Sequence, residues 1–79
     1  MQLITHSTQI GAILAARRKT LKQSQTQVAE KLGLSQNRLS ELELQPETMT
    51  VAQLLALANI LGLALNIGDA AGGKHKVEW

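Results

Sequence analysis

The amino-acid sequence predicts an all-α fold, because apolar residues recur at helical spacing, two capping boxes mark helix starts, and Leu and Ala are abundant. Of the 79 residues, 44% are hydrophobic, with no Tyr or Phe and a single Trp. The core must therefore consist of Leu, Ile, Val and Ala, a composition that favours helices. A domain of this length buries only about 60% of its unfolded surface, so we expect it to need a partner surface.

The first of four predicted helices spans about 8–20, with its N-cap at Ser7 or Thr8. Its last turns carry three basic residues, Arg17, Arg18 and Lys19. One interpretation is a solvated helix end, where cations suit the negative end of the helix dipole. The other is that Arg17 or Lys19 faces phosphate groups of a ligand while Arg18 turns inward.

The second and third helices are separated by a short turn at Gly33. The second helix starts at the capping box of Ser24 and Gln27, because each of these side chains can satisfy a backbone N–H at the helix start. This helix ends at residue 32. Gly33 can adopt the left-handed conformation that ends a helix, and Ser35 is a good N-cap for the third helix, which spans 36 to about 42 or 43. Two short helices joined in this way form a helix-turn-helix pattern, in which the second helix is the candidate reader of DNA.

The fourth helix is predicted to start at Val51, after a second capping box formed by Thr50 and Gln53. Gly62 ends it. We expect this to be the main core helix, with Leu57 widening the buried face of a broad apolar stripe made of Val51, Leu54, Leu55, Ala58 and Leu61.

A different pattern follows the fourth helix, because Leu63, Leu65 and Ile67 alternate with smaller or polar residues at the period of a strand. A lone strand is not stable, so the natural partner is the same segment of a second subunit across a two-fold axis. The alternative is an extended tail lying on the core. We thus expect a domain over 1–68 and a flexible tail over 69–79, whose terminal Trp79 docks on its own domain or on a partner.

Charge is distributed unevenly along the chain. Residues 1–40 hold six basic residues against one acidic residue, whereas residues 41–79 hold two basic residues against five acidic ones, and the net charge is +2. The basic half suits a phosphate backbone, and the acidic half suits a different partner. Cysteine is absent, and we recognise neither a membrane-spanning run nor a signal peptide, so we expect a cytoplasmic protein.

The candidate site residues lie on the helix-turn-helix segment. If Leu39 and Leu42 face the core, polar side chains suited to pairing with base edges fall on or near the opposite side of the third helix, namely Gln36, Asn37 and Ser40. Arg38 could reach guanine or a phosphate, or could simply balance Glu41. Gln25, in the first turn of the second helix, is placed to hold a phosphate oxygen, the alternative being plain solvent exposure.

No catalytic arrangement is recognisable, so we expect no enzyme activity, cofactor or metal site. His6 and His75 are isolated, and their ordinary role is on the surface or in the tail. The segment Gly72-Gly73-Lys74 lacks the first glycine and the Ser or Thr of a phosphate-binding loop.

The segment 24–43 resembles the helix-turn-helix of the Cro/cI-type (XRE) repressor family. The resemblance covers about 8–62 and rests on residues at the family's characteristic intervals: Gln25, Ala29, Gly33, Leu34, Ser35, Leu39, Leu42 and Glu43. It implies a four-helix, lambda-repressor-like domain in which Arg18 pairs with Glu43 as part of the scaffold. It also implies that Gln25 holds phosphate and that Ser35, Gln36, Asn37 and Ser40 approach bases.

The chain beyond the fourth helix is similar to the antitoxin of HipA/HipB toxin–antitoxin systems. The similar features are the strand-like LALNIGDA and a short tail ending in Glu78-Trp79. This resemblance implies a homodimer paired through the strand, which binds palindromic operator DNA and represses its own operon. It further implies a HipA-like serine/threonine kinase toxin as partner, contacted by Trp79. A free-standing repressor without a toxin, or a protein-interaction adaptor with the same fold, are the alternatives.

Overall fold

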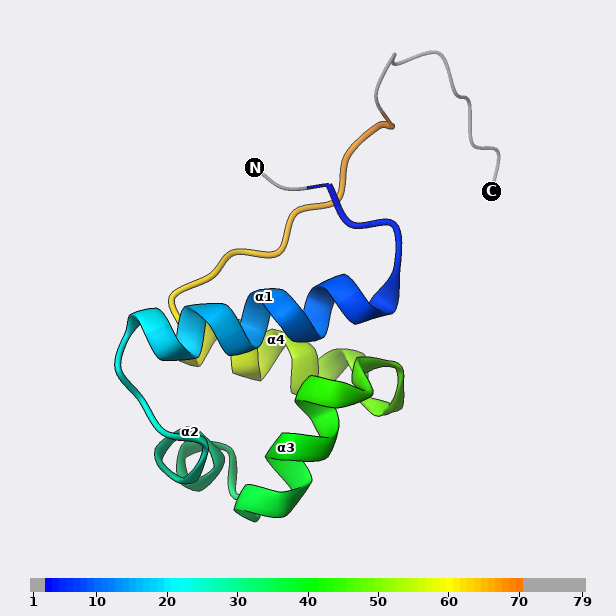
Figure 1. Ribbon diagram of the computed structural model, residues 1–79. Coiled ribbons are helices and arrows are strands. Elements are labelled where there is room, and N and C mark those ends of the chain that lie inside the picture. Colours follow the sequence, from blue (N-terminus) through cyan, green and yellow to red (C-terminus); the bar gives the residue numbers. More distant parts are fainter. Residues whose placement is uncertain (1–2, 71–79) are drawn as a thin grey trace.

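The computed structural model describes residues 3–70, which form four α-helices and one short 3-10 helix (Figure 1). These elements are α1 (Ser7–Thr20), α2 (Gln25–Leu32), α3 (Gln36–Leu44), η1 (Pro46–Thr48) and α4 (Val51–Ile60). Helix α3 contacts both α1 and α2, and α2 also contacts α4; α2 and α3 are seen below α1 in Figure 1. No strand occurs between residues 3 and 70, so the all-α prediction is confirmed for this part of the chain.

Both predicted capping boxes are present. At the start of α2, the backbone N–H of Gln27 donates to the Ser24 hydroxyl at 3.1 Å, and the backbone N–H of Ser24 donates to the Gln27 side-chain oxygen at 2.8 Å. Thr50 and Gln53 form the same pair of bonds at the start of α4, at 3.0 and 2.9 Å. These starts were predictable because the signal is local: each box satisfies two backbone donors with side chains three residues apart.

The start of α1 differs from the prediction, because the N-cap is His6 and not Ser7 or Thr8. The side-chain oxygen of Gln9 accepts from the backbone N–H groups of Thr5 and His6, at 2.7 and 2.8 Å. Gln9, at the third helical position, thus satisfies the backbone N–H groups of the N-cap and of the residue before it, and the helix starts one residue earlier than predicted.

The core lies where α1, α2, α3 and α4 meet. Its buried apolar residues are Leu14, Val28, Ala29, Leu39, Leu42, Leu57, Ala58 and Leu61. The predicted buried face of α4 was wrong at Val51 and Leu55, which are 71% and 44% exposed, whereas Leu57, Ala58 and Leu61 are buried as predicted. Since Leu and Ala occur on several sides of α4, its periodicity alone could not select the buried face.

Helices α1 and α3 approach each other closely at Gly11. A Cβ atom at this buried position would lie 2.1 Å from the carbonyl oxygen of Glu43 and 3.3 Å from the side chain of Pro46. Only a residue without a side chain allows this approach. The contact brings the last turn of α3, which carries Glu43, against the middle of α1.

Beyond α4, residues 63–70 form neither helix nor strand. Leu63 is half-buried against the core, while Leu65 is 42% and Ile67 is 96% exposed. The predicted strand pairing needs a second chain and stays a prediction. Trp79 and most of the predicted tail lie outside the described residues.

Within residues 3–70, none of the helices has the length and apolar character needed to span a bilayer.

Candidate nucleic-acid interface

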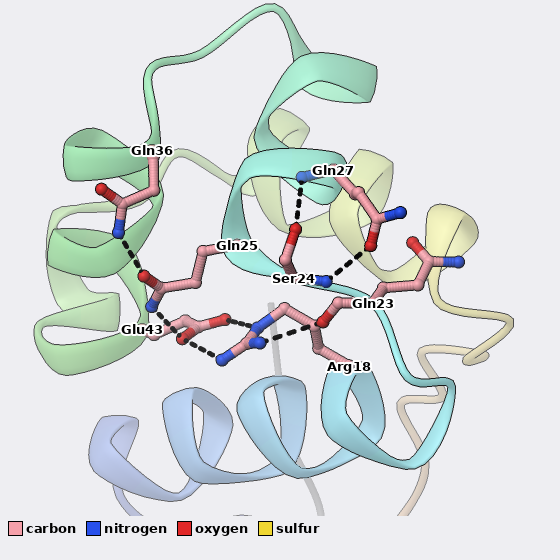
Figure 2. A network of polar contacts seen from close by, with 7 residues as sticks. All are labelled: Arg18, Gln23, Ser24, Gln25, Gln27, Gln36 and Glu43. Carbon is pink, nitrogen blue, oxygen red and sulfur yellow. Dashed lines mark hydrogen bonds and ion pairs between the residues drawn. The ribbon is translucent and has the colours of Figure 1, made fainter.

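A buried ion pair joins the last turns of α1 and α3. Arg18 Nε donates to Glu43 Oε2 at 2.8 Å, and Arg18 Nη2 donates to Glu43 Oε1 at 3.2 Å (Figure 2). The two side chains are only 11% and 9% exposed. Two parallel bonds between a guanidinium and a carboxylate fix the relative orientation of both groups. Arg18 is therefore turned inward, and it forms with Glu43 the pair that the resemblance implies.

Hydrogen bonds continue from this ion pair to the starts of α2 and α3. Gln25 Nε2 donates to Glu43 Oε1 at 2.9 Å, and Gln36 Nε2 donates to Gln25 Oε1. Figure 2 shows the resulting chain of contacts, which passes from Arg18 through Glu43 and Gln25 to Gln36. We call these four residues the polar chain. It connects a buried charge pair to two glutamines that stand at the first positions of their helices.

Both glutamines keep hydrogen-bonding groups that no residue between 3 and 70 uses. Gln36 has one amide N–H and its side-chain oxygen free, and Gln25 has one amide N–H free. A side-chain amide that offers a donor and an acceptor side by side matches the N6 and N7 edge of adenine. A free N–H near a helix N-terminus matches a phosphate oxygen.

The outer surface of α3 differs in part from the predicted set of base-facing residues. Gln36 and Asn37 are exposed, but Ser40 is half-buried and lines a groove between α1 and α3, with a volume of about 450 Å³, that Lys19 and Gln25 also line. Ser35 accepts from the Arg38 N–H at 3.1 Å as the N-cap of α3, which leaves its hydroxyl hydrogen free.

Glu41 is a surface residue that the sequence interpretation treated only as a counter-charge. It is exposed and lies one turn after Asn37 on α3. The i, i+4 spacing was the available signal, because two residues at that spacing share one helix face. Arg38 Nη1 approaches Glu41 Oε2 only to 4.0 Å, so this ion pair is loose and both side chains stay accessible.

The two remaining basic candidates occupy different environments. Arg17 is half-buried and donates from Nε to the carbonyl oxygen of Leu61 at 2.8 Å, so it satisfies a carbonyl at the C-terminal end of α4. Lys19 is exposed. The structure thus engages Arg17 in the fold and leaves Lys19 accessible to a ligand.

In the part of the chain that the structure describes, no three His, Cys, Asp or Glu residues gather in a way that could hold a metal ion.

The chain matches a known protein family. The model of the helix-turn-helix family matches residues 14–67, which is more than half of the chain. The matched segment includes all of α2, α3 and α4 and the second half of α1. Neither a curated protein nor a solved structure matches the chain.

Proposed function

Because the chain belongs to the helix-turn-helix family, a DNA-binding regulatory family, we propose that it reads a palindromic operator as a homodimer. The observation that carries this proposal is the polar chain. It holds Gln25 and Gln36 side by side at the starts of two helices, with their remaining donors and acceptor free. Side chains fixed before binding lose less conformational entropy when they contact a base.

In this proposal, Gln36 and Asn37 contact base edges from the N-terminal end of α3, the end that usually enters the major groove. The free donor and acceptor of Gln36 suit adenine. Ser35 and Ser40 add hydroxyl groups beside them. The exposed carboxylate of Glu41 can accept from the N4 amino group of cytosine, and it would repel phosphates at that point of the site.

Phosphate contacts supply affinity and register, and we assign them to Gln25, Arg38 and Lys19. The exposed Lys19 lines the groove that Gln25 also lines, so the two can act on neighbouring phosphates. We do not assign a phosphate contact to Arg17, since its guanidinium already binds the carbonyl oxygen of Leu61 at the end of α4.

The homodimer would pair residues 63–67 of the two chains across a two-fold axis. Leu65 and Ile67 support this proposal, because they are apolar, exposed and carried by an extended segment that has no strand partner within residues 3–70. Such a dimer would place its recognition helices about 34–36 Å apart, in successive major grooves.

We further propose that the dimer is an antitoxin that represses its own operon and neutralises a HipA-like serine/threonine kinase, with Trp79 contacting the kinase. The support is the resemblance of residues 63–70 and of Glu78-Trp79 to antitoxins of that type. The competing functions are a repressor without a toxin and an adaptor that binds protein and not specific DNA.

The DNA-binding proposal is tested by selecting duplexes from a random library with the purified protein. Enrichment of an inverted repeat whose half-sites lie one helical turn apart supports a dimeric operator reader. Recovery of unselected sequence, with binding that disappears at moderate salt, would instead favour the adaptor.

The antitoxin proposal is tested by purifying the tagged protein from its native host and identifying retained proteins by mass spectrometry. A kinase that is retained by the full chain and lost when Val77 to Trp79 are deleted supports the proposal. Retention of no kinase, while the same preparation binds the selected operator, would favour the free-standing repressor.

A further inference from the structure

Three helices of this chain end in the same pattern of backbone hydrogen bonds. At the end of α2, Gly33 N donates to Glu30 O, and Leu34 N donates to Ala29 O. The end of α4 repeats this pattern: Gly62 N donates to Asn59 O, and Leu63 N donates to Ala58 O. These pairs of bonds define the Schellman motif, which places one residue in the left-handed conformation.

The third Schellman motif, at the end of α1, has a lysine at the left-handed position. Lys22 N donates to Lys19 O at 2.9 Å, and Gln23 N donates to Arg18 O at 3.1 Å. Lys22 has a φ of 57°, close to the 71° of Gly33 and the 70° of Gly62. Among residues 3–70, it is the only residue other than glycine with a positive φ. A side chain in this conformation is disfavoured, so the fold would be more stable with glycine here.

The turn that carries Lys22 is tied to the polar chain. Arg18 accepts from the Gln23 N–H with its carbonyl oxygen and donates to the Gln23 carbonyl from Nη1 at 3.1 Å. The same guanidinium holds Glu43, and Glu43 holds Gln25. The backbone of Lys22 is therefore fixed relative to the first turn of α2.

The ammonium group of Lys22 is available to a ligand. The side chain is exposed, and the salt bridges that form within residues 3–70 use Arg18 and Arg38 and not Lys22. The N-cap of α2, Ser24, follows two residues later, so Lys22 adds a full positive charge beside a helix N-terminus, which itself favours anions.

We propose that Lys22 binds a phosphate of the DNA backbone and that the chain keeps lysine at this strained position for that contact. The inference rests on the proposed DNA-binding function and adds to it a residue outside the predicted phosphate set. It accounts for the difference between Lys22 and the glycines that end α2 and α4, because glycine would relieve the strain but would remove the charge.

The test is Lys22→Gly in the full chain, with two measurements. The first is the thermal midpoint, which should rise by about 4 °C, since relief of the left-handed strain outweighs the added flexibility of glycine. The second is affinity for two duplexes of equal length, the selected operator and a scrambled version, across a series of salt concentrations. Affinity for both duplexes should fall by about eightfold per chain at 0.1 M salt. The slope of log affinity against log salt concentration should become shallower by about 0.9 per chain.

Three control variants separate a phosphate contact from a general effect of charge. Lys22→Arg keeps the charge and should preserve affinity, whereas Lys22→Asn removes the charge, tolerates the left-handed conformation and should lose affinity as glycine does. Lys31→Gln changes the net charge equally at another exposed lysine and should have a smaller effect.

Unchanged affinity and salt dependence in Lys22→Gly would overturn the inference while leaving the DNA-binding function intact. A loss of affinity in Lys31→Gln as large as that in Lys22→Gly would have the same consequence. Failure of the unmodified protein to bind either duplex would overturn the proposed function itself, and the inference with it.

Discussion

Glu43 accepts hydrogen bonds from both Arg18 and Gln25, although only 9% of its side chain is exposed. A buried carboxylate is tolerated only when its oxygens are paired and hydrogen-bonded, and here Arg18 supplies the opposite charge. Within residues 3–70, every buried side-chain nitrogen or oxygen has a hydrogen-bond partner. At the residue scale, the same side chain therefore stabilises the fold and orients Gln25.

Replacing Arg18 with methionine should destabilise the protein strongly, because it leaves the Glu43 carboxylate buried without its partner. We expect a loss of about 3–5 kcal/mol in the free energy of unfolding, measured by urea denaturation. The matched control is Arg38→Met, which removes an exposed pair at 4.0 Å and should cost less than about 1 kcal/mol. Similar losses in the free energy of unfolding for the two variants would show that burial of the ion pair between Arg18 and Glu43 does not add to stability.

At the element scale, local signals in the sequence located the helices well, while the faces that they bury depended on tertiary packing. The capping boxes at Ser24 and Thr50 were predictable because each lies within four consecutive residues. The contact between Gln25 and Gln36 joins residues eleven positions apart through a turn, and its geometry follows from how α2 packs on α3. Arg17 could not be assigned to the end of α4 because its partner lies 44 residues away.

The orientation of α4 can be tested by comparing two leucines two positions apart. Leu57→Ala should cost about 2–5 kcal/mol in the free energy of unfolding, because the buried side chain leaves a cavity in the core. Leu55→Ala should cost much less, since that side chain is 44% exposed. Urea denaturation measures both losses, and a larger loss for Leu55→Ala than for Leu57→Ala would contradict the burial of Leu57 and the exposure of Leu55 on α4.

At the scale of the whole molecule, two surfaces of different chemistry emerge. One carries the polar chain and the exposed residues of α3, and the other includes an apolar groove of about 320 Å³ lined by residues of α1, α4 and the segment 63–65. A small domain with exposed apolar side chains gains stability by covering them with a second copy. The proposed dimer would supply this cover and would also set the spacing of the two recognition helices.

Replacing Ile67 with aspartate should shift the protein from dimer to monomer, because a charge would enter the proposed strand pairing. Light scattering after size-exclusion chromatography measures the molar mass directly. The exposed Asn59→Asp on α4 is the charge-matched control and should remain dimeric. A monomeric unmodified protein, or an Ile67→Asp variant that stays dimeric, would remove residues 63–67 from the interface.

The polar chain is proposed to present Gln36 to a base. The affinity of Gln36→Ala for the selected operator and for a scrambled duplex tests this proposal. Asn59→Ala, on exposed surface of α4, serves as the control. We expect Gln36→Ala to weaken binding to the operator by about 1–3 kcal/mol and to change binding to the scrambled duplex little. The reason is that base contacts give sequence specificity, whereas phosphate contacts give affinity for any duplex. Equal losses on the two duplexes would contradict the claim that Gln36 reads a base.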